Sequence, residues 1–225
     1  MGRREELFDH VKRNVIIGVV REEDPETAMQ LARTYAEHGL RVIEITMTTP
    51  DAIGILERLV EQYGGGGIIF AAGTVRGSNM AAEARRAGAQ ILVSPHTDVT
   101  VIDYAVEHDL FCVAGAATTT EIIHAWELGA NVIKVYPAGL LGGPDYIRTI
   151  RQPIRDVPML AGGPVAIDQI EPYLSAGAVA LNMAGSIAPP DLVRAGKWKD
   201  VGRHIAMAIS TVQSWRSTRV ESVVH

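Results

Sequence analysis

The chain has 225 residues, 47% of them hydrophobic and 21% charged, a balance typical of a globular protein whose core needs no disulfides to support it. Its net charge of −5 argues against nucleic acid as a partner, and no apolar stretch reaches the roughly 18 residues that span a membrane. The single cysteine excludes an internal disulfide and, with a charged N-terminus unlike a signal peptide, predicts a cytoplasmic protein.

One pattern recurs along the chain after a short helix predicted at about residues 4–13. An apolar run is followed by a segment whose apolar residues have helical spacing, and this happens eight times. The runs lie at 14–20, 41–47, 68–73, 91–94, 111–116, 131–138, 158–163 and 178–185. Several predicted helices end in a glycine just before the next run, which is typical of a helix C-cap: Gly39, Gly88, Gly129 and Gly177.

Runs that are apolar on both faces belong in parallel sheets covered by helices. Eight such units without a break in composition predict an α/β protein with a single (β/α)₈ TIM barrel over 14–210, in one domain spanning 1–225. No GxGxxG motif opens the first helix, which disfavours a Rossmann fold. The core pattern stops after residue 212, so we expect the tail at 212–225 to be at least partly disordered.

Lys134 is the most unusual residue of the predicted barrel, because it lies inside the apolar run NVIKVYPA. The other three lysines fall in the terminal regions, where solvated helical faces are expected. Reactive groups of such barrels lie at the C-terminal ends of the strands, and desolvation there favours the neutral amine of a lysine. A neutral amine condenses with a ketone, so Lys134 predicts Schiff-base chemistry.

Glu44 is the one carboxylate in the eight predicted strands. Its neighbours Ile43 and Ile45 face the other way, so strand alternation directs Glu44 into the barrel, with Thr48 on the same side. A carboxylate near the lysine supplies the proton transfers that Schiff-base chemistry needs. A purely structural alternative stays open, in which the Lys134 ammonium simply pairs with Glu44.

Neither a metal nor another cofactor is expected, because only His96 of the seven histidines lies near the C-terminal end of a predicted strand. His96 either lines the mouth of the pocket or is a plain loop residue. The turns after strands seven and eight contain glycines, and many barrels hold a phosphate there through backbone N–H groups. Simple turn chemistry is the alternative, but the position makes Gly162, Gly163, Gly185 and Ser186 candidate substrate-binding residues.

Taken together, these motifs resemble those of the KDPG/KHG aldolases, which cleave 2-keto-3-deoxy-6-phosphogluconate or 4-hydroxy-2-oxoglutarate and release pyruvate. The likeness covers about residues 14–210 and depends on GVVREEDPETA, VIEITMTTP, AAGTV, SPH, KVYPAGLLGGPDYI and AGGP. The resemblance implies a class I aldolase that acts on a small 2-keto acid, needs no metal and assembles as a homotrimer.

The resemblance also implies roles for single residues. Lys134 would form the Schiff base and Glu44 would be the acid/base. Thr74, in AAGTV, would help to hold the carboxylate of the keto acid. Pro95 and Tyr136 would line the pyruvate pocket, with Tyr136 standing where the family usually has phenylalanine.

Several positions depart from the family pattern and leave open which 2-keto acid is the substrate and whether it is phosphorylated. Thr48 stands where many members have a carboxylate-binding arginine, and it offers only one neutral hydrogen bond. Ala161 replaces a threonine before Gly162, and Pro164 removes a backbone donor from the phosphate cradle. Asn182 stands where glycine is common, in a run (LNMAGS) that is one residue longer than usual.

Two other functions stay open. A sugar-phosphate isomerase or epimerase would use Lys134 and Glu44 only to shuttle protons, and borohydride with pyruvate would then leave no adduct on Lys134. A non-catalytic barrel would bind a phosphorylated ligand or serve as a scaffold, and Lys134→Ala would then leave ligand binding and assembly nearly intact.

Overall fold

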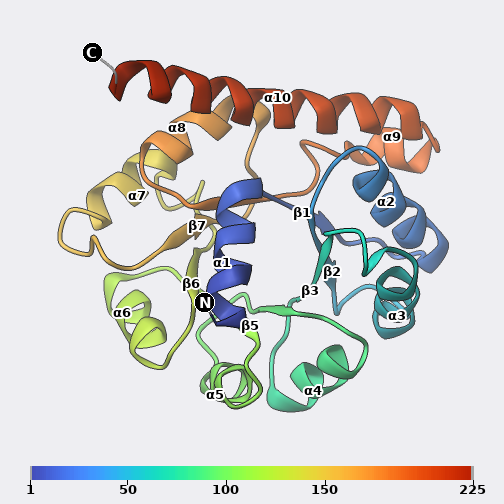
Figure 1. The fold of residues 1–225 in the computed structure, drawn as a ribbon, viewed down its shortest axis with the longest axis horizontal. Coiled ribbons are helices and arrows are strands. Elements are labelled where there is room, and N and C mark those ends of the chain that lie inside the picture. Colours follow the sequence, from blue (N-terminus) through green and yellow to red (C-terminus); the bar gives the residue numbers. More distant parts are fainter. Residues whose placement is uncertain (1, 224–225) are drawn as a thin grey trace.

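Eight parallel strands close into a barrel in sequence order, in a computed structural model that describes residues 2–223 (Figure 1). The strands are β1 (Ile16–Val20), β2 (Val42–Thr46), β3 (Ile69–Gly73), β4 (Ile91–Val93), β5 (Phe111–Ala116), β6 (Val132–Val135), β7 (Met159–Ala161) and β8 (Ala180–Met183). Each strand lies within one of the eight apolar runs, so the predicted TIM barrel is confirmed.

The helices form a layer outside the barrel (Figure 1). They are α2 (Pro25–Glu37), α3 (Ala52–Tyr63), α4 (Ser78–Arg86), α5 (Val99–Glu107), α6 (Thr119–Glu127), α7 (Gly143–Ile150), the short 3-10 helix η1 (Ile167–Gln169), α8 (Ile170–Ser175), α9 (Pro190–Arg194) and α10 (Trp198–Val223). Asp24 caps α2 by accepting a hydrogen bond from the Thr27 backbone N–H. The predicted C-cap glycines all have positive φ: Gly39, Gly88, Gly129 and Gly177.

Strand alternation divides the buried apolar residues into two clusters. Ile43 and Ile45 of β2 belong to the larger cluster, which packs the sheet against the surrounding helices. Val42, on the opposite face of the same strand, belongs to a smaller cluster inside the barrel, together with Phe111 and Leu160. The interior is therefore filled with apolar side chains near the strand N-termini, and the polar residues of the interior lie further along the strands.

Helix α1 (Arg3–Asn14) closes the N-terminal end of the barrel and confirms the short helix predicted at about 4–13. Leu7 and Val11 are buried in the cluster inside the barrel. Arg4 holds the helix in place, because its guanidinium donates to the carbonyl of Gly129 and, at 2.9 Å, to Oδ1 of Asn131. Figure 1 shows α1 lying across the end of the barrel that faces the viewer.

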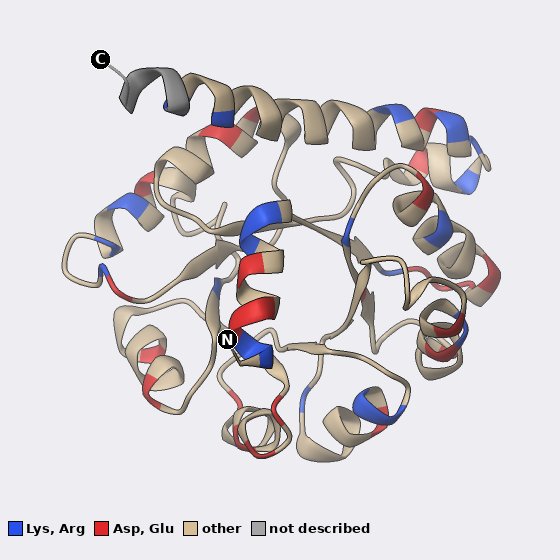
Figure 2. Cartoon of the chain, viewed as in Figure 1, with Lys and Arg blue, Asp and Glu red and all other residues tan. Residues whose placement is uncertain are grey.

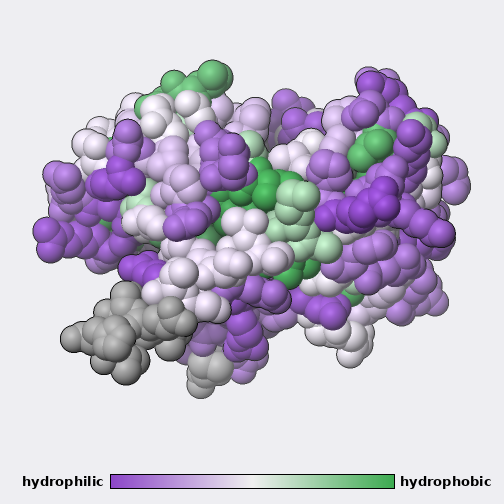
Figure 3. All heavy atoms as spheres, turned by 90° about the horizontal axis from the view of Figure 1, so that it is seen from above, coloured by the Kyte–Doolittle hydropathy of each residue, from purple (hydrophilic) through white to green (hydrophobic). Residues whose placement is uncertain are grey.

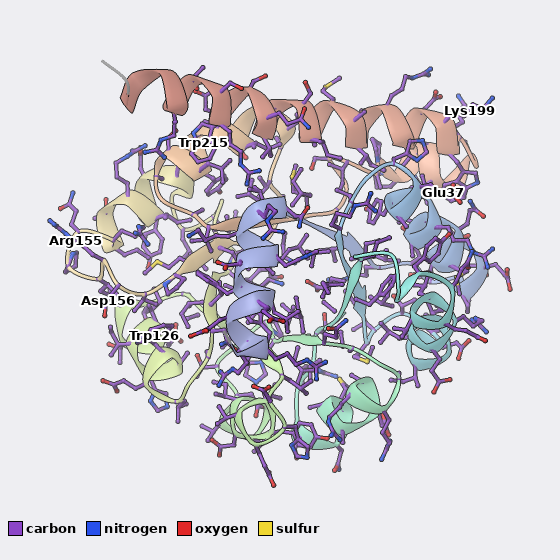
Figure 4. The ribbon with its side chains drawn as sticks, in the orientation of Figure 1. Glu37, Trp126, Arg155, Asp156, Lys199 and Trp215 are labelled. Carbon is purple, nitrogen blue, oxygen red and sulfur yellow. The ribbon has the colours of Figure 1, made fainter. Side chains whose placement is uncertain are left out.

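Helix α10 extends into the tail at 212–225, which was expected to be partly disordered. Residues 212–223 continue this helix, and residues 224–225 lie outside the described part of the chain. The helix is held by packing, since Val212 is buried and Nε1 of Trp215 donates to Oγ of Ser175 on α8 at 3.1 Å. Figure 4 shows Trp215 between α10 and the α8 region. The apolar residues of this segment are too sparse to form a visible core pattern in the sequence.

Charged residues lie mostly on the helices, α1 included, and on the loops, whereas the strands of the barrel carry few of them (Figure 2). The side that carries α10 is largely hydrophilic, with a smaller hydrophobic area near its middle (Figure 3). Within residues 2–223, no helix combines the length and the apolar character needed to cross a bilayer.

Candidate active site

A cavity of about 700 Å³ opens at the C-terminal ends of the strands, at the opposite end of the barrel from α1. Five of the predicted site residues line it: Lys134, Tyr136, Gly163, Gly185 and Ser186. Three others contact residues that line it: Glu44 lies against Asn182, Thr74 against Arg21 and Gly162 against Lys134. Thr48 and Pro95 are not among the lining residues. The structure thus brings half of the predicted site into one cavity.

Lys134 reaches the cavity from β6, with only 7% of its surface exposed. Its aliphatic stem passes over Gly162, where an added Cβ would lie 2.6 Å from Lys134 Cε. Its Nζ lies 5.5 Å from the centre of the Tyr136 ring. The absence of a side chain at Gly162 therefore makes room for the lysine, and the Tyr136 ring borders its amine.

Glu44 lies in the middle of β2 and is 1% exposed. Its Oε2 accepts a hydrogen bond from Nδ2 of Asn182 on β8, at 2.5 Å. Its Oε1 lies against Gly73 of β3, where an added Cβ would collide with that oxygen and lie 2.5 Å from Cδ. Among the described residues, Oε1 has no hydrogen-bond partner. A buried carboxylate with one free acceptor is suited to exchange a proton with a bound ligand.

Lys134 and Glu44 face the barrel interior without forming an ion pair. Their strands, β6 and β2, are four places apart in the eight-stranded ring, so the side chains come from opposite walls. None of the ion pairs that the described residues form, with N to O within 4.0 Å, includes either one. The purely structural alternative, an ammonium held by Glu44, is therefore not what the structure shows.

Arg21 was not among the predicted site residues, although it lines the cavity directly after β1. Its Nη2 donates to Oγ1 of Thr74 at 3.3 Å, and Thr74 has a φ of 59°, which is uncommon for threonine. Thr48, by contrast, is exposed, and its Oγ1 lies 3.1 Å from that of Thr46. A guanidinium directly after β1 thus lies near the predicted carboxylate site, whereas Thr48, after β2, provides no charged group. The position of Arg21 directly after a predicted strand was the sequence signal that could have identified it.

Asn182 was noted in the sequence only as a departure from the family pattern. The structure shows that it is 3% exposed, lines the cavity and contacts Glu44. A lone amide within the apolar strand ALNM was a signal of its importance. Its partner could not be identified from sequence, because the two residues are 138 positions apart.

Pro95 and His96 form the loop after β4. The backbone of this loop lies directly against Gly115 of β5, where an added Cβ would be 2.5 Å from the backbone nitrogen of His96. The exposed His96 side chain lies with Nε2 3.5 Å from Oδ2 of Asp98. These contacts favour the reading of His96 as a loop residue. Among residues 2–223, no three His, Cys, Asp or Glu side chains come together as a possible metal site.

The loops after β7 and β8 form the far wall of the cavity. Oγ of Ser186 donates to the carbonyl of Val165 at 2.6 Å, which ties the two loops together. Gly163 has a φ of 107°, a conformation that favours glycine. Glu22 adds a partly buried carboxylate to this cavity, and burial raises its pKa, although the charge of Arg194 acts in the opposite direction. The lining of the cavity therefore carries charges of both signs, from Arg21 and Glu22.

Comparison with known proteins places the chain among aldolases. The family model for KDPG and KHG aldolase matches residues 7–204. The chain is 29% identical over 195 residues to 2-dehydro-3-deoxy-phosphogluconate aldolase of Treponema pallidum (strain Nichols), covering 87% of this chain and 92% of the relative. It is also 29% identical over 202 residues to 2-dehydro-3-deoxy-6-phosphogalactonate aldolase of Escherichia coli (strain K12), covering 89% and 94%.

Solved structures agree on the fold. A native KDPGal structure has a TM-score of 0.80 at 25% identity and covers 90% of this chain and 96% of its own. The KDPG aldolase of Legionella pneumophila, with pyruvate captured as a covalent carbinolamine intermediate, has a TM-score of 0.82 at 22% identity, covering 89% and 97%. The family match spans all eight strands and includes Lys134 and Glu44. The chain therefore belongs to the KDPG and KHG aldolase family.

Proposed function

We propose that this protein is a class I aldolase that cleaves a 2-keto-3-deoxy-6-phospho sugar acid, or 4-hydroxy-2-oxoglutarate, to pyruvate and an aldehyde. The observation that carries the proposal is Lys134, a lysine inside the barrel whose side chain lines the cavity at the strand C-termini. The names of the relatives from Treponema pallidum and Escherichia coli support this class of reaction, a carbon–carbon lyase.

In this reaction the Lys134 amine attacks the C2 carbonyl of the keto acid, and the resulting carbinolamine loses water to form an iminium ion. A carboxylate then removes the proton of the C4 hydroxyl, and the C3–C4 bond breaks with its electron pair moving into the iminium. The products are an aldehyde and an enamine on Lys134. The enamine takes a proton at C3, and hydrolysis releases pyruvate. The free Oε1 of Glu44 is the group that we assign to these proton transfers.

The remaining predicted site residues, together with Arg21, are assigned to substrate binding. Arg21 and Thr74 share a hydrogen bond at the rim, and a guanidinium with a hydroxyl beside it suits a carboxylate. Tyr136 borders the amine of Lys134 and would line the pyruvate pocket with Pro95 and Thr48. The turns after β7 and β8 would hold the far end of the substrate through Gly162, Gly163, Gly185 and Ser186.

The proposal also includes the oligomeric state and the cellular compartment of the enzyme. A homotrimer is expected from the family resemblance, and light scattering on the purified protein would measure the mass of the assembly. A cytoplasmic, reducing compartment agrees with a single cysteine that is buried as a free thiol.

Reductive trapping tests the proposal. Borohydride added with pyruvate should leave a covalent adduct on Lys134, located by peptide mass spectrometry, and Lys134→Ala should abolish both the adduct and cleavage. Lys199→Ala is the matched control, because Lys199 is exposed on α10, outside the barrel (Figure 4). A protein that cleaves a keto acid without an adduct at Lys134, or one that only isomerises sugar phosphates, would overturn the proposal.

A further inference from the structure

Asn182 contacts the acid/base residue from a strand on the far side of β1. Its Nδ2 donates to Oε2 of Glu44 at 2.5 Å, and both side chains are buried, at 3% and 1% exposure. Asn182 also lines the cavity that Lys134 enters. It is thus placed between the carboxylate and the space in which a substrate would bind.

Two acceptor atoms of this pair have no partner among the described residues, Oε1 of Glu44 and Oδ1 of Asn182. Buried polar atoms in folded proteins are nearly always hydrogen-bonded, and exceptions call for an explanation. Asn182 lines the cavity and Glu44 lies directly behind it, so a donor on the ligand, such as a hydroxyl or an iminium N–H, would explain these unpaired acceptors. The geometry therefore points to a site whose hydrogen bonds are completed by the reacting molecule.

The Asn182 amide and the Glu44 carboxylate have different roles in the proposed proton transfer. An amide N–H can only donate, so it occupies Oε2 as its acceptor. On its other side the Glu44 carboxylate lies against Gly73, and the missing side chain of this glycine makes room for Oε1, since an added Cβ would collide with it. The carboxylate is therefore fixed at both oxygens, and Oε1 is the oxygen left to exchange a proton.

We propose that Asn182 is a positioning residue, which orients Glu44 for proton transfer to and from the substrate bound on Lys134. The inference rests on the proposed aldolase function. Its distinctive consequence is that loss of the amide should slow proton transfer while the Schiff base still forms. A merely structural amide would instead affect folding and leave the rate of proton transfer per folded molecule unchanged.

Exchange of the methyl protons of pyruvate with deuterium from solvent measures this step without an aldehyde, because each exchange requires deprotonation and reprotonation of the Lys134 adduct. In Asn182→Leu, which keeps a similar volume but has no donor, exchange and kcat should fall roughly 10- to 100-fold, the loss expected when one hydrogen bond to a charged group is removed. The final yield of the borohydride-trapped adduct should stay near that of the wild type, and KM should change less than kcat.

Three variants complete the experiment. Asn182→Asp keeps the shape but replaces the donor with an acceptor, so it should lose exchange even if Asn182→Leu does not fold. Asn182→Gln retains a donor and should recover part of the rate. Met183→Leu, the next residue on β8, is buried in the cluster outside the barrel and should leave the exchange rate unchanged.

The outcomes separate the two proposals. If wild-type protein forms no adduct with pyruvate, the aldolase function itself fails. If wild-type protein forms the adduct but folded Asn182→Leu or Asn182→Asp exchanges pyruvate protons at the wild-type rate, the role of Asn182 fails and the aldolase function stands. Equal loss of adduct and exchange would also overturn the positioning role.

Discussion

Replacing Gly73 with alanine should disturb Glu44 and little else. The φ of Gly73 lies outside the left-handed region, so the backbone itself accepts alanine. The three nearest atoms to an added Cβ all belong to Glu44, with Cγ at 2.6 Å and Cδ at 2.5 Å. These contacts are too short for any real Cβ, and the carboxylate stem is enclosed. Glu44 must therefore turn away from its present position.

The expected size of the effect follows from overpacking and from the loss of an acid/base group. Overpacking a buried site costs about 1–3 kcal/mol, which for a chain of this length lowers Tm by roughly 2–12 °C. The rate of cleavage should fall by a factor on the order of 10²–10⁴, as for removal of a general acid/base. Gly65→Ala is the control, because an added Cβ there meets no atom within 4 Å.

A double-mutant cycle gives the decisive measurement. The free energy of unfolding, from urea titration, should drop on Gly73→Ala in the wild type but barely change when the same substitution is made in Glu44→Ala, where the colliding atoms are absent. An equal loss of stability in both backgrounds, or full activity in Gly73→Ala, would refute the reasoning.

Other regions of the molecule give three further predictions. Burial raises the pKa of the Cys112 thiol to about 12, so the native protein should resist alkylation at pH 8. Because the thiol ionises more readily in the unfolded chain, the free energy of unfolding should decline as pH rises above about 9, and less so in Cys112→Ala. Burial also raises the pKa of Glu22, so the charged form of this side chain destabilises the folded protein at pH 7 but not in acid, where it is protonated. Glu22→Gln should therefore raise Tm at pH 7, whereas Glu23→Gln, at an exposed position, should not. Deleting residues 212–225 should lower Tm, because it removes buried Val212 and the contact of Trp215 with α8.

The fold was predictable because its signal is local and repeated. Each strand is a short apolar run, each helix has its own spacing, and glycines such as Gly129 mark the turns. Lys134 and Glu44 were predictable for a related reason, since a charge inside an apolar strand contradicts its surroundings and needs an explanation.

The sequence could not show which side chains contact one another once the barrel closes. The contact of Asn182 with Glu44 depends on barrel closure, which brings β8 beside β1. Arg21 begins the charged run REED, which resembles a solvated loop, and its position directly after the first apolar run was the one sequence signal. Only the fold shows that it lies beside Thr74. The second half of α10 was missed because the few apolar side chains along it, such as Trp215, pack on separate neighbours and leave no continuous stripe.

Helix α1 covers the N-terminal end of the barrel, so the interior is open only at the C-terminal ends of the strands. Leu7 and Val11 fill the lower opening, so whatever reaches Lys134 must pass through the upper one. In the proposed reaction the pyruvate half would stay covalently bound to Lys134 after the C3–C4 bond breaks, and the aldehyde half would lie toward the single opening. We therefore expect ordered release, with the aldehyde leaving first and pyruvate last, and synthesis in the reverse direction should require pyruvate to bind before the aldehyde.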